Sequence, residues 1–150
     1  MEVEKKTKSK NCFIEGPIPS DFIGDSIKKH QLNTTIGAHQ IFLGQVRADI
    51  IENKQVSAIE YSAQKEMSNN ILDQLKQQTI RKFNLNCLHI YHSLGKVNTG
   101  EICLFVFASS KHRKNAQLAI EYSVEEIKSK TPIFGKEIFS DNSHQWKTNT

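Results

Sequence analysis

Apolar residues recur along the chain in two periods, which predict strands where they alternate or run together and helices where they return every three or four positions. Strands are expected at residues 12–14, 38–46, 56–61, 85–92 and 102–108. Helices are expected at residues 19–30, 66–83 and 116–130. Neighbouring strands joined by short polar turns favour antiparallel pairs, and two long helices can cover one face of a sheet. The pattern therefore predicts an α+β two-layer domain with a mainly antiparallel sheet.

The two longer helices each carry an apolar stripe that is expected to face the sheet. In the first of them the stripe consists of Met67, Ile71, Leu75 and Phe83. In the second it consists of Ala116, Ala119, Ile120, Ser123 and Ile127. Between the strands, Leu94-Gly95 is expected to start a turn that continues to Gly100. Beyond Pro132 the alternation is weak, and residues 133–137 are expected to form an apolar loop.

The composition is that of an ordinary globular protein, with 37% hydrophobic and 24% charged residues. A length of 150 residues suits one domain, which we expect to span residues 12–150 after a charged, disordered tail at residues 1–11. The net charge of +4 argues only weakly for a polyanionic partner, and we expect no nucleic acid. No apolar stretch is long enough to cross a bilayer, so no membrane partner is expected.

The cysteines bear on the cellular compartment. Cys12, Cys87 and Cys103 form no CxxC pair, and an odd number without a disulfide framework fits a reducing environment. The N-terminal residues contain no apolar segment of the kind found in secretory signals. We therefore expect a cytoplasmic protein, with no metal site and no cofactor.

The segment SSKHRKN at residues 109–115 places cations at an unfavourable position. Ser110 is a good N-cap, so residues 111–114 would fill the first turn of the following helix. A helix N-terminus carries partial positive charge and favours acidic side chains. The cluster is either a solvated basic face or an anion site, in which backbone N–H groups and cationic side chains bind the ligand together. Histidine titrates near neutral pH, so His112 could serve there as an acid or a base.

Three further cations are candidates for chemistry, although each alone is more often an ordinary surface residue. Arg47 follows a strand, where a guanidinium can bind a ligand in bidentate fashion. Lys128 lies in the last turn of a helix, where a cation also suits the helix dipole. Lys136 follows Gly135 in the apolar segment, and a lysine that loses solvation is suited to proton transfer or nucleophilic attack.

In their order along the chain, these motifs resemble those of the large, catalytic subunits of molybdopterin synthase. The matching segments are FLGQVR at 42–47, EY at 60–61, EM at 66–67, HSLG at 92–95, GE at 100–101, SSKHR at 109–113, IK at 127–128, PIFGKE at 132–137 and WK at 146–147. Each motif is weak alone, but the ordered set extends from about residue 13 to residue 147.

The resemblance implies an α/β-hammerhead-like fold and a sulfurtransferase reaction. Sulfur would pass from a small ubiquitin-like carrier, whose Gly-Gly C-terminus bears a thiocarboxylate, to cyclic pyranopterin monophosphate, giving the dithiolene of molybdopterin. The cyclic phosphate would supply the anion that the basic segment lacks. The resemblance also implies a homodimer of large subunits with one carrier at each end, a heterotetramer, in which Arg47 acts on the pocket of the neighbouring protomer.

The resemblance further assigns roles to individual residues. The implied catalytic residues are Lys128 and Lys136. The implied substrate-binding residues are Gln45, Val46, Arg47, His112, Arg113, Gly135 and Glu137. The family usually has Pro-Ile-Trp-Lys where this chain has Pro-Ile-Phe-Gly, so Gly135 stands at the place of the second lysine. We expect Gly135 to permit a bulge that brings Lys136 into one cleft with Lys128 and His112.

Two other functions fit the same residues. The basic segment could belong to a non-catalytic module that binds anions or RNA, although no aromatic residue for base stacking lies between its cations. The chain could also be an inactive scaffold that keeps the carrier contact but has lost a catalytic lysine. Formation of product, carrier binding without product, or neither would separate the three hypotheses.

Overall fold

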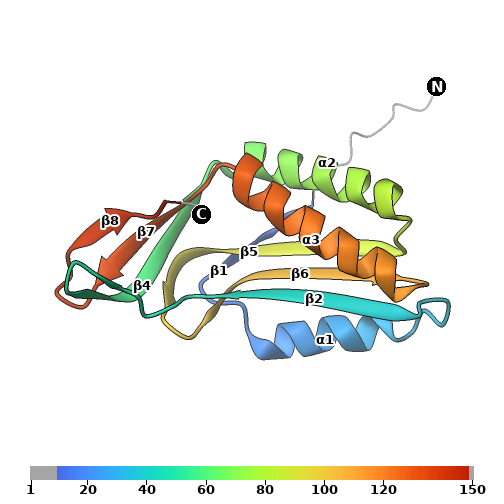
Figure 1. Cartoon of the computed structure of the whole chain (residues 1–150), viewed down its shortest axis with the longest axis horizontal. Helices are drawn as coiled ribbons and strands as arrows, with labels where there is room; N and C mark the ends of the chain where they lie inside the picture. The colour runs from blue at the N-terminus through green and yellow to red at the C-terminus, as the bar shows by residue number, and fades with distance from the viewer. Residues whose placement is uncertain (1–9, 149–150) are drawn as a thin grey trace, which may run out of the picture.

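The computed structural model describes residues 10–148 and forms an α+β domain (Figure 1). Its helices are α1 (Ser20–His30), α2 (Lys65–Phe83) and α3 (Arg113–Lys130). Its strands are β1 (Phe13–Glu15), β2 (Ala38–Gln45), β3 (Ile50–Ile51), β4 (Lys54–Ala63), β5 (Cys87–Asn98), β6 (Ile102–Ser110), β7 (Ile133–Phe139) and β8 (His144–Trp146). Most of the tail expected at residues 1–11 lies outside the described residues. Between residues 10 and 148, no helix combines the length and the apolar character needed to span a bilayer.

The strands form a sheet in the order β2-β6-β5-β4-β7-β8, with β1 beside β5 and β3 beside β4. Every pair is antiparallel except β1 with β5. Helices α2 and α3 lie side by side on one face of the β2-β6-β5 half, and α1 lies on the other face (Figure 1). The predicted α+β class, with a mainly antiparallel sheet and two long helices on one face, is confirmed.

Strand β5 joins the two halves of the sheet. Its first half pairs with β6, and its second half, from Gly95 to Asn98, pairs with β4 (Figure 1). The turn expected at Leu94-Gly95 is therefore wrong, because the strand continues to Asn98. Gly95 has a φ of +80°, which residues with a side chain rarely adopt, so this glycine changes the direction of the strand without ending it.

The buried faces of the two long helices agree only in part with the sequence pattern. The stripe expected on α3 is confirmed, because its five residues are the buried residues of that helix. On α2 the expectation is partly wrong: Met67 is 54% exposed, whereas Ser68 and Leu72 are fully buried. Polar residues can occupy this face because their hydrogen bonds are satisfied inside the protein, as when Thr79 Oγ1 donates to the Leu75 carbonyl at 2.6 Å.

The weakly alternating segment after α3 folds as a β-hairpin beside β4. Strand β7 pairs with β4 along its whole length, and β8 returns antiparallel to β7. The loop expected at residues 133–137 is therefore a strand. Residues of β7 alternate between the two faces of the sheet, which decides which of their side chains can reach a site on either face.

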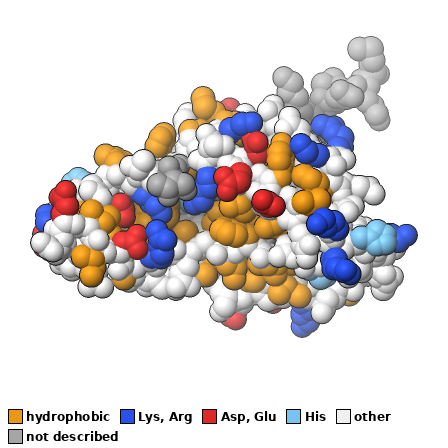
Figure 2. Space-filling model, in the orientation of Figure 1, with side chains coloured by type: hydrophobic (Ala, Val, Ile, Leu, Met, Phe, Trp, Pro, Cys, Tyr) orange, Lys and Arg blue, Asp and Glu red, His pale blue; other side chains and the backbone are white. Residues whose placement is uncertain are grey.

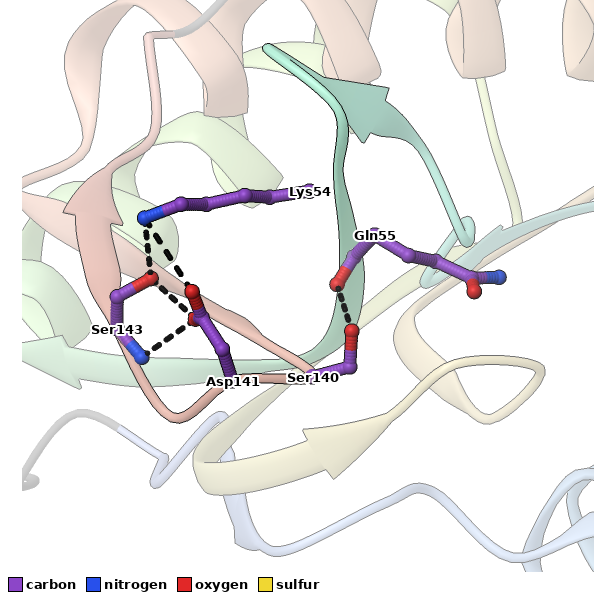
Figure 3. A network of polar contacts seen from close by, with 5 residues as sticks. All are labelled: Lys54, Gln55, Ser140, Asp141 and Ser143. Carbon is purple, nitrogen blue, oxygen red and sulfur yellow. Dashed lines mark hydrogen bonds and ion pairs between the residues drawn. The ribbon is translucent and has the colours of Figure 1, made fainter.

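A polar network fastens the turn of this hairpin to the start of β4 (Figure 3). Lys54 Nζ lies 3.4 Å from an Asp141 carboxylate oxygen and donates to Ser143 Oγ at 3.1 Å. The Ser140 N–H donates to the Gln55 carbonyl at 2.9 Å. Hydrogen bonds from Ser143, together with Lys54, lower the pKa of Asp141 to about 2. The network holds the hairpin in register, so that the chain after β8 runs back along β7.

Candidate active site

A small pocket lies where the C-terminal end of α3 meets β4, β5 and β7. Its internal volume is about 30 Å³, which is enough for one small group. Two lysines from distant parts of the chain line it together with aromatic, aliphatic and hydroxyl groups. The lining residues are Tyr61, His92, Ile127, Lys128, Thr131, Ile133, Gly135 and Lys147.

Lys128 comes from the last turn of α3, directly after Ile127, whose burial fixes this end of the helix on the sheet. Lys128 is exposed as a whole residue. Partial burial of its amine nevertheless lowers its pKa; Cys103 opposes this shift, and the charge of Lys147 adds to it. A lowered pKa makes the neutral amine more accessible than in an ordinary lysine, which favours a role in general acid and base catalysis.

His92 and Tyr61 line the pocket from β5 and β4. His92 is 4% exposed, and its Nδ1–H donates to the Ser93 carbonyl at 2.7 Å, which leaves Nε2 as the unprotonated nitrogen. Burial lowers the pKa of His92 to about 4; the Ser93 carbonyl opposes this shift and Lys128 adds to it. Burial also raises the pKa of Tyr61. Both side chains are therefore uncharged at neutral pH, and their rings meet edge to face at 4.9 Å between centroids.

The burial of neutral His92 predicts a pH-dependent stability. Between pH 6.5, the ordinary pKa, and about 4, the unfolded chain binds a proton at this residue while the folded chain does not. The free energy of unfolding should therefore fall as the pH falls through this window, by about 3 kcal/mol for His92 alone. Urea unfolding of the wild type and of His92→Leu at pH 7 and pH 4.5 measures this contribution. The variant should lose less stability than the wild type, and an equal loss would contradict the assignment. His144→Leu, on the exposed strand β8, is the control.

A larger hollow of about 330 Å³ adjoins this pocket and shares Lys147 with it. Arg47 and Glu137, two of the predicted substrate-binding residues, line this hollow. The guanidinium of Arg47 lies 3.2 Å from an oxygen of Asp49, and both side chains are well exposed. Such a surface ion pair contributes little stability, so Arg47 can exchange this partner for an anionic ligand at small cost.

Lys136 does not reach the pocket. Gly135 stands opposite Tyr61 in the β4–β7 ladder and Lys136 stands opposite Glu60, so their side chains belong to opposite faces of the sheet. Lys136 Nζ lies 3.8 Å from a carboxylate oxygen of Glu60. The described ladder is regular at Gly135, without the expected bulge. The expectation that Lys136 shares a cleft with Lys128 is therefore wrong.

The basic segment lies at the other end of α3, where lysine, arginine and histidine side chains gather on the surface (Figure 2). Ser110 ends β6, so the helix begins at Arg113, with His112 as N-cap residue in place of the predicted Ser110. The first turn contains no acidic residue and no capping side chain. At a rise of about 1.5 Å per residue, Arg113 and Lys128 lie about 22 Å apart. The predicted convergence of His112 with Lys128 is therefore wrong within one chain.

The two predicted residues before Arg47 differ in their surroundings. Val46 is 2% exposed and belongs to the main core. Its N–H donates to the Glu101 carbonyl, and its carbonyl accepts from Gly100. Val46 therefore has a packing role and presents neither its side chain nor a free backbone group, contrary to the prediction. Gln45 is exposed at the end of β2, next to a shift in strand register.

One group of potential metal ligands lies elsewhere in the described residues. The ligating atoms of His30, Cys87 and His89 lie within 4.8 Å of one another. The two histidine Nε2 atoms are 2.9 Å apart, which fits a hydrogen bond between the rings, and His30 Nδ1 donates to the Ser26 carbonyl at 2.6 Å. Burial lowers the pKa of His89 to about 4, and His30 and nearby lysines act in the same direction. The two rings already use their Nε2 atoms on each other, and we assign no metal there.

A sequence model of the MoaE protein family matches residues 19–130, well over half of the chain. The chain belongs to the MoaE protein family. It is 28% identical to the molybdopterin synthase catalytic subunit of Bos taurus over 148 residues, which cover 99% of this chain and 76% of that protein. It is 33% identical to the corresponding subunit of Dictyostelium discoideum over 116 residues, which cover 75% of this chain and 73% of that protein. The family resemblance found in the sequence is confirmed.

Solved structures agree with this membership of the MoaE family. Molybdopterin synthase from Staphylococcus aureus matches with a TM-score of 0.78 and 28% identity, covering 91% of this chain and 95% of that one. A complex of subunits 1 and 2 of the molybdopterin-converting factor from Helicobacter pylori matches with a TM-score of 0.77. That match has 20% identity, covers 91% of this chain and 88% of the other, and shows likeness of fold.

Four residues with polar side-chain groups that line the lysine pocket of this MoaE-family chain were not among the predicted site residues: Tyr61, His92, Thr131 and Lys147. Three of them lie in segments that carry the family resemblance, yet a motif gives no direction for a side chain. The strand alternation of β4 could have placed Tyr61 and Glu60 on opposite faces. The WK segment at 146–147 does not reveal that Lys147 lines the pocket, because Lys147 reaches it only through the pairing of β8 with β7.

Proposed function

We propose that the protein is the catalytic subunit of molybdopterin synthase and transfers sulfur from a thiocarboxylated carrier to cyclic pyranopterin monophosphate. The observation that carries this proposal is a partly buried Lys128, with a lowered pKa, in a pocket of a MoaE-family fold. Sulfur arrives already activated on the carrier, so the reaction needs proton transfer and charge stabilisation more than a protein nucleophile. The lining of the pocket offers these groups.

The residues of this pocket can divide the work of the reaction. Lys128 can donate a proton to a leaving oxygen of the substrate and take one back, because a lowered pKa makes its ammonium form a stronger acid than that of an ordinary lysine. The unprotonated Nε2 of His92 can accept a hydrogen bond, while burial keeps this ring neutral. The small volume limits the pocket to the reacting groups, so the rest of the pterin would lie in the adjoining hollow, near Arg47.

The partner in this proposal is a small ubiquitin-like subunit with a Gly-Gly C-terminus. The structure from Helicobacter pylori that shares this fold is a complex of two subunits of the molybdopterin-converting factor. A pocket of about 30 Å³ admits a chain end without side chains more readily than one with them. The three cysteines are free, which is consistent with the reducing cytoplasm as the site of the reaction.

The distance between the two ends of α3 supports a homodimer of large subunits, and with two carriers a heterotetramer. A substrate held at Lys128 cannot also touch His112 and Arg113 of the same chain across about 22 Å. A second copy, related by twofold symmetry, would bring its own basic segment to this pocket. The phosphate of the substrate would then complete the uncapped, cationic start of α3.

The proposal is tested by mixing the purified protein with thiocarboxylated carrier and pterin precursor and measuring dithiolene product. We expect product in proportion to the carrier consumed. Binding of carrier without any product would instead identify an inactive scaffold. Failure of both, together with RNA binding that weakens steeply with salt, would identify a nucleic-acid module.

A further inference from the structure

We propose that Lys147 is the second amine of the Lys128 pocket and contacts the anionic group of the substrate or carrier there. This inference rests on the proposed function and adds a residue to its site. It differs from the sequence expectation, which gave the role to Lys136. Three independent features of the structure support it: the anchoring of Lys147, the absence of a side chain at Gly135, and a buried hydroxyl group in the same pocket.

The backbone of Lys147 is fixed beside the pocket. Its N–H donates to the Gly135 carbonyl at 2.7 Å, directly after the pairing of Trp146 with Lys136. This hydrogen bond extends the β7–β8 ladder by one residue beyond the end of β8. The polar network at the hairpin turn sets the same register from the other end (Figure 3). Lys147 is therefore placed by main-chain pairing, although it lies close to the end of the chain.

Gly135 keeps its own position on β7 free of any side chain. A Cβ atom there would lie 3.1 Å from Ile59 Cγ2 and 3.2 Å from Tyr61 Cε1, closer than most real contacts. A side chain at this position would press on the aromatic wall of the pocket. With glycine at this position, no side chain crowds Ile59 and Tyr61, and space remains for Lys147 to line the pocket from the neighbouring chain segment.

The pocket also contains a polar group that points to a ligand. Thr131 is 9% exposed, and its Oγ1 has no hydrogen-bond partner among the described residues. An unsatisfied buried hydroxyl costs stability unless something binds to it. Two ammonium groups at one pocket also repel each other, and the charge of Lys147 indeed lowers the pKa of Lys128. An anionic oxygen or sulfur between the two amines, within reach of Thr131, would relieve both costs.

Lys147 further connects the two hollows of the site. It lines the small pocket with Lys128 and the larger hollow with Arg47. No other residue lines both of these hollows in the described part of the chain. A cation at this junction is positioned to hold negative charge that passes from the substrate-binding hollow to the reacting atoms.

The experiment compares Lys147→Ala, Lys147→Arg and the matched variant Lys136→Ala, which removes a lysine from the opposite face of the same hairpin. Single-turnover sulfur transfer should fall about 100-fold in Lys147→Ala, as for loss of one charge-stabilising group, and remain near the wild-type rate in Lys136→Ala. Lys147→Arg keeps the charge and should recover part of the loss.

A second measurement does not depend on the reaction. Competitive acetylation at several pH values, read by mass spectrometry, gives the pKa of the Lys128 amine. Removing the charge in Lys147→Ala should raise that pKa, and Lys136→Ala should leave it unchanged. An unchanged Lys128 titration and an unchanged transfer rate in Lys147→Ala would overturn the inference. Absence of product from the wild-type protein would instead overturn the proposed function, while the acetylation result still decides whether the two amines interact.

Discussion

Replacing Lys128 by alanine is expected to lower the single-turnover rate of sulfur transfer by about 10²- to 10⁴-fold, the range for loss of a general acid or base. The lysine lies in a pocket that desolvates its amine and lowers its pKa, and His92 lines the same pocket. Rapid mixing with thiocarboxylated carrier and pterin precursor, followed by product analysis, measures the effect. Carrier binding should be nearly unchanged, because the substitution removes chemistry and not an interface.

The matched control for Lys128→Ala is Lys130→Ala, two residues along the same helix. Lys130 lies outside the pocket lining, is well exposed, and pairs with the partly buried Glu126 at 2.6 Å. A surface pair of this kind contributes little, so the variant should keep the wild-type rate. Lys128→Arg should remain impaired, because a guanidinium does not release its proton at any accessible pH. Equal activity of Lys128→Ala and Lys130→Ala would remove Lys128 from the mechanism.

The second large effect is expected for the double variant His112→Ala/Arg113→Ala, which should lose nearly all precursor binding and turnover. Both residues are distant from Lys128 along α3, so we expect them to act on the pocket of the other protomer. Mixing this variant with Lys128→Ala should then restore about a quarter of the wild-type activity, because half of the twofold dimers are mixed and one of their two pockets is intact.

The mixing experiment has a clear alternative outcome. If His112 and Arg113 served the pocket of their own chain, every pocket in the mixture would lack one essential group, and no activity would return. Each variant alone provides the baseline, and size-exclusion chromatography shows that the subunits have exchanged. A double variant with undiminished precursor binding would also remove the explanation for the cationic start of α3.

Much of the fold could be predicted because the local pattern of apolar and polar residues indicates where helices and strands lie. The inner stripe of α3 and the positions of the central strands follow from periodicity alone. The turn expected at Gly95 was wrong because glycine is common both in turns and at bends inside strands. Only the pairing of residues 95–98 with β4 shows that Gly95 belongs to a bent strand. The start of α3 was misplaced because Ser110 remains paired with β2 at the end of β6.

The site was harder to predict than the fold, because its residues meet only through tertiary pairing. The sequence motifs identified Lys128 and Arg47 as candidate site residues. They do not reveal which side chains share a pocket. Because side chains alternate along β7, Lys136 lies on the face of the sheet opposite the pocket. Lys147 lines the pocket because β8 pairs back along β7. Neither placement leaves a local signal, since both depend on the register between strands.

The continuity of β5 has a consequence for how the enzyme can work. One unbroken strand pairs with β6 beneath the helical layer and then with β4 beside the lysine pocket. Residues 92–94, at the junction of the two ladders, pair with β1, so bending between the halves would have to disturb this pairing, and we expect the halves to keep their relative orientation. The relative placement of the reacting amines is thus fixed when the chain folds, and a bound substrate meets a preorganised catalyst that needs little reorganisation.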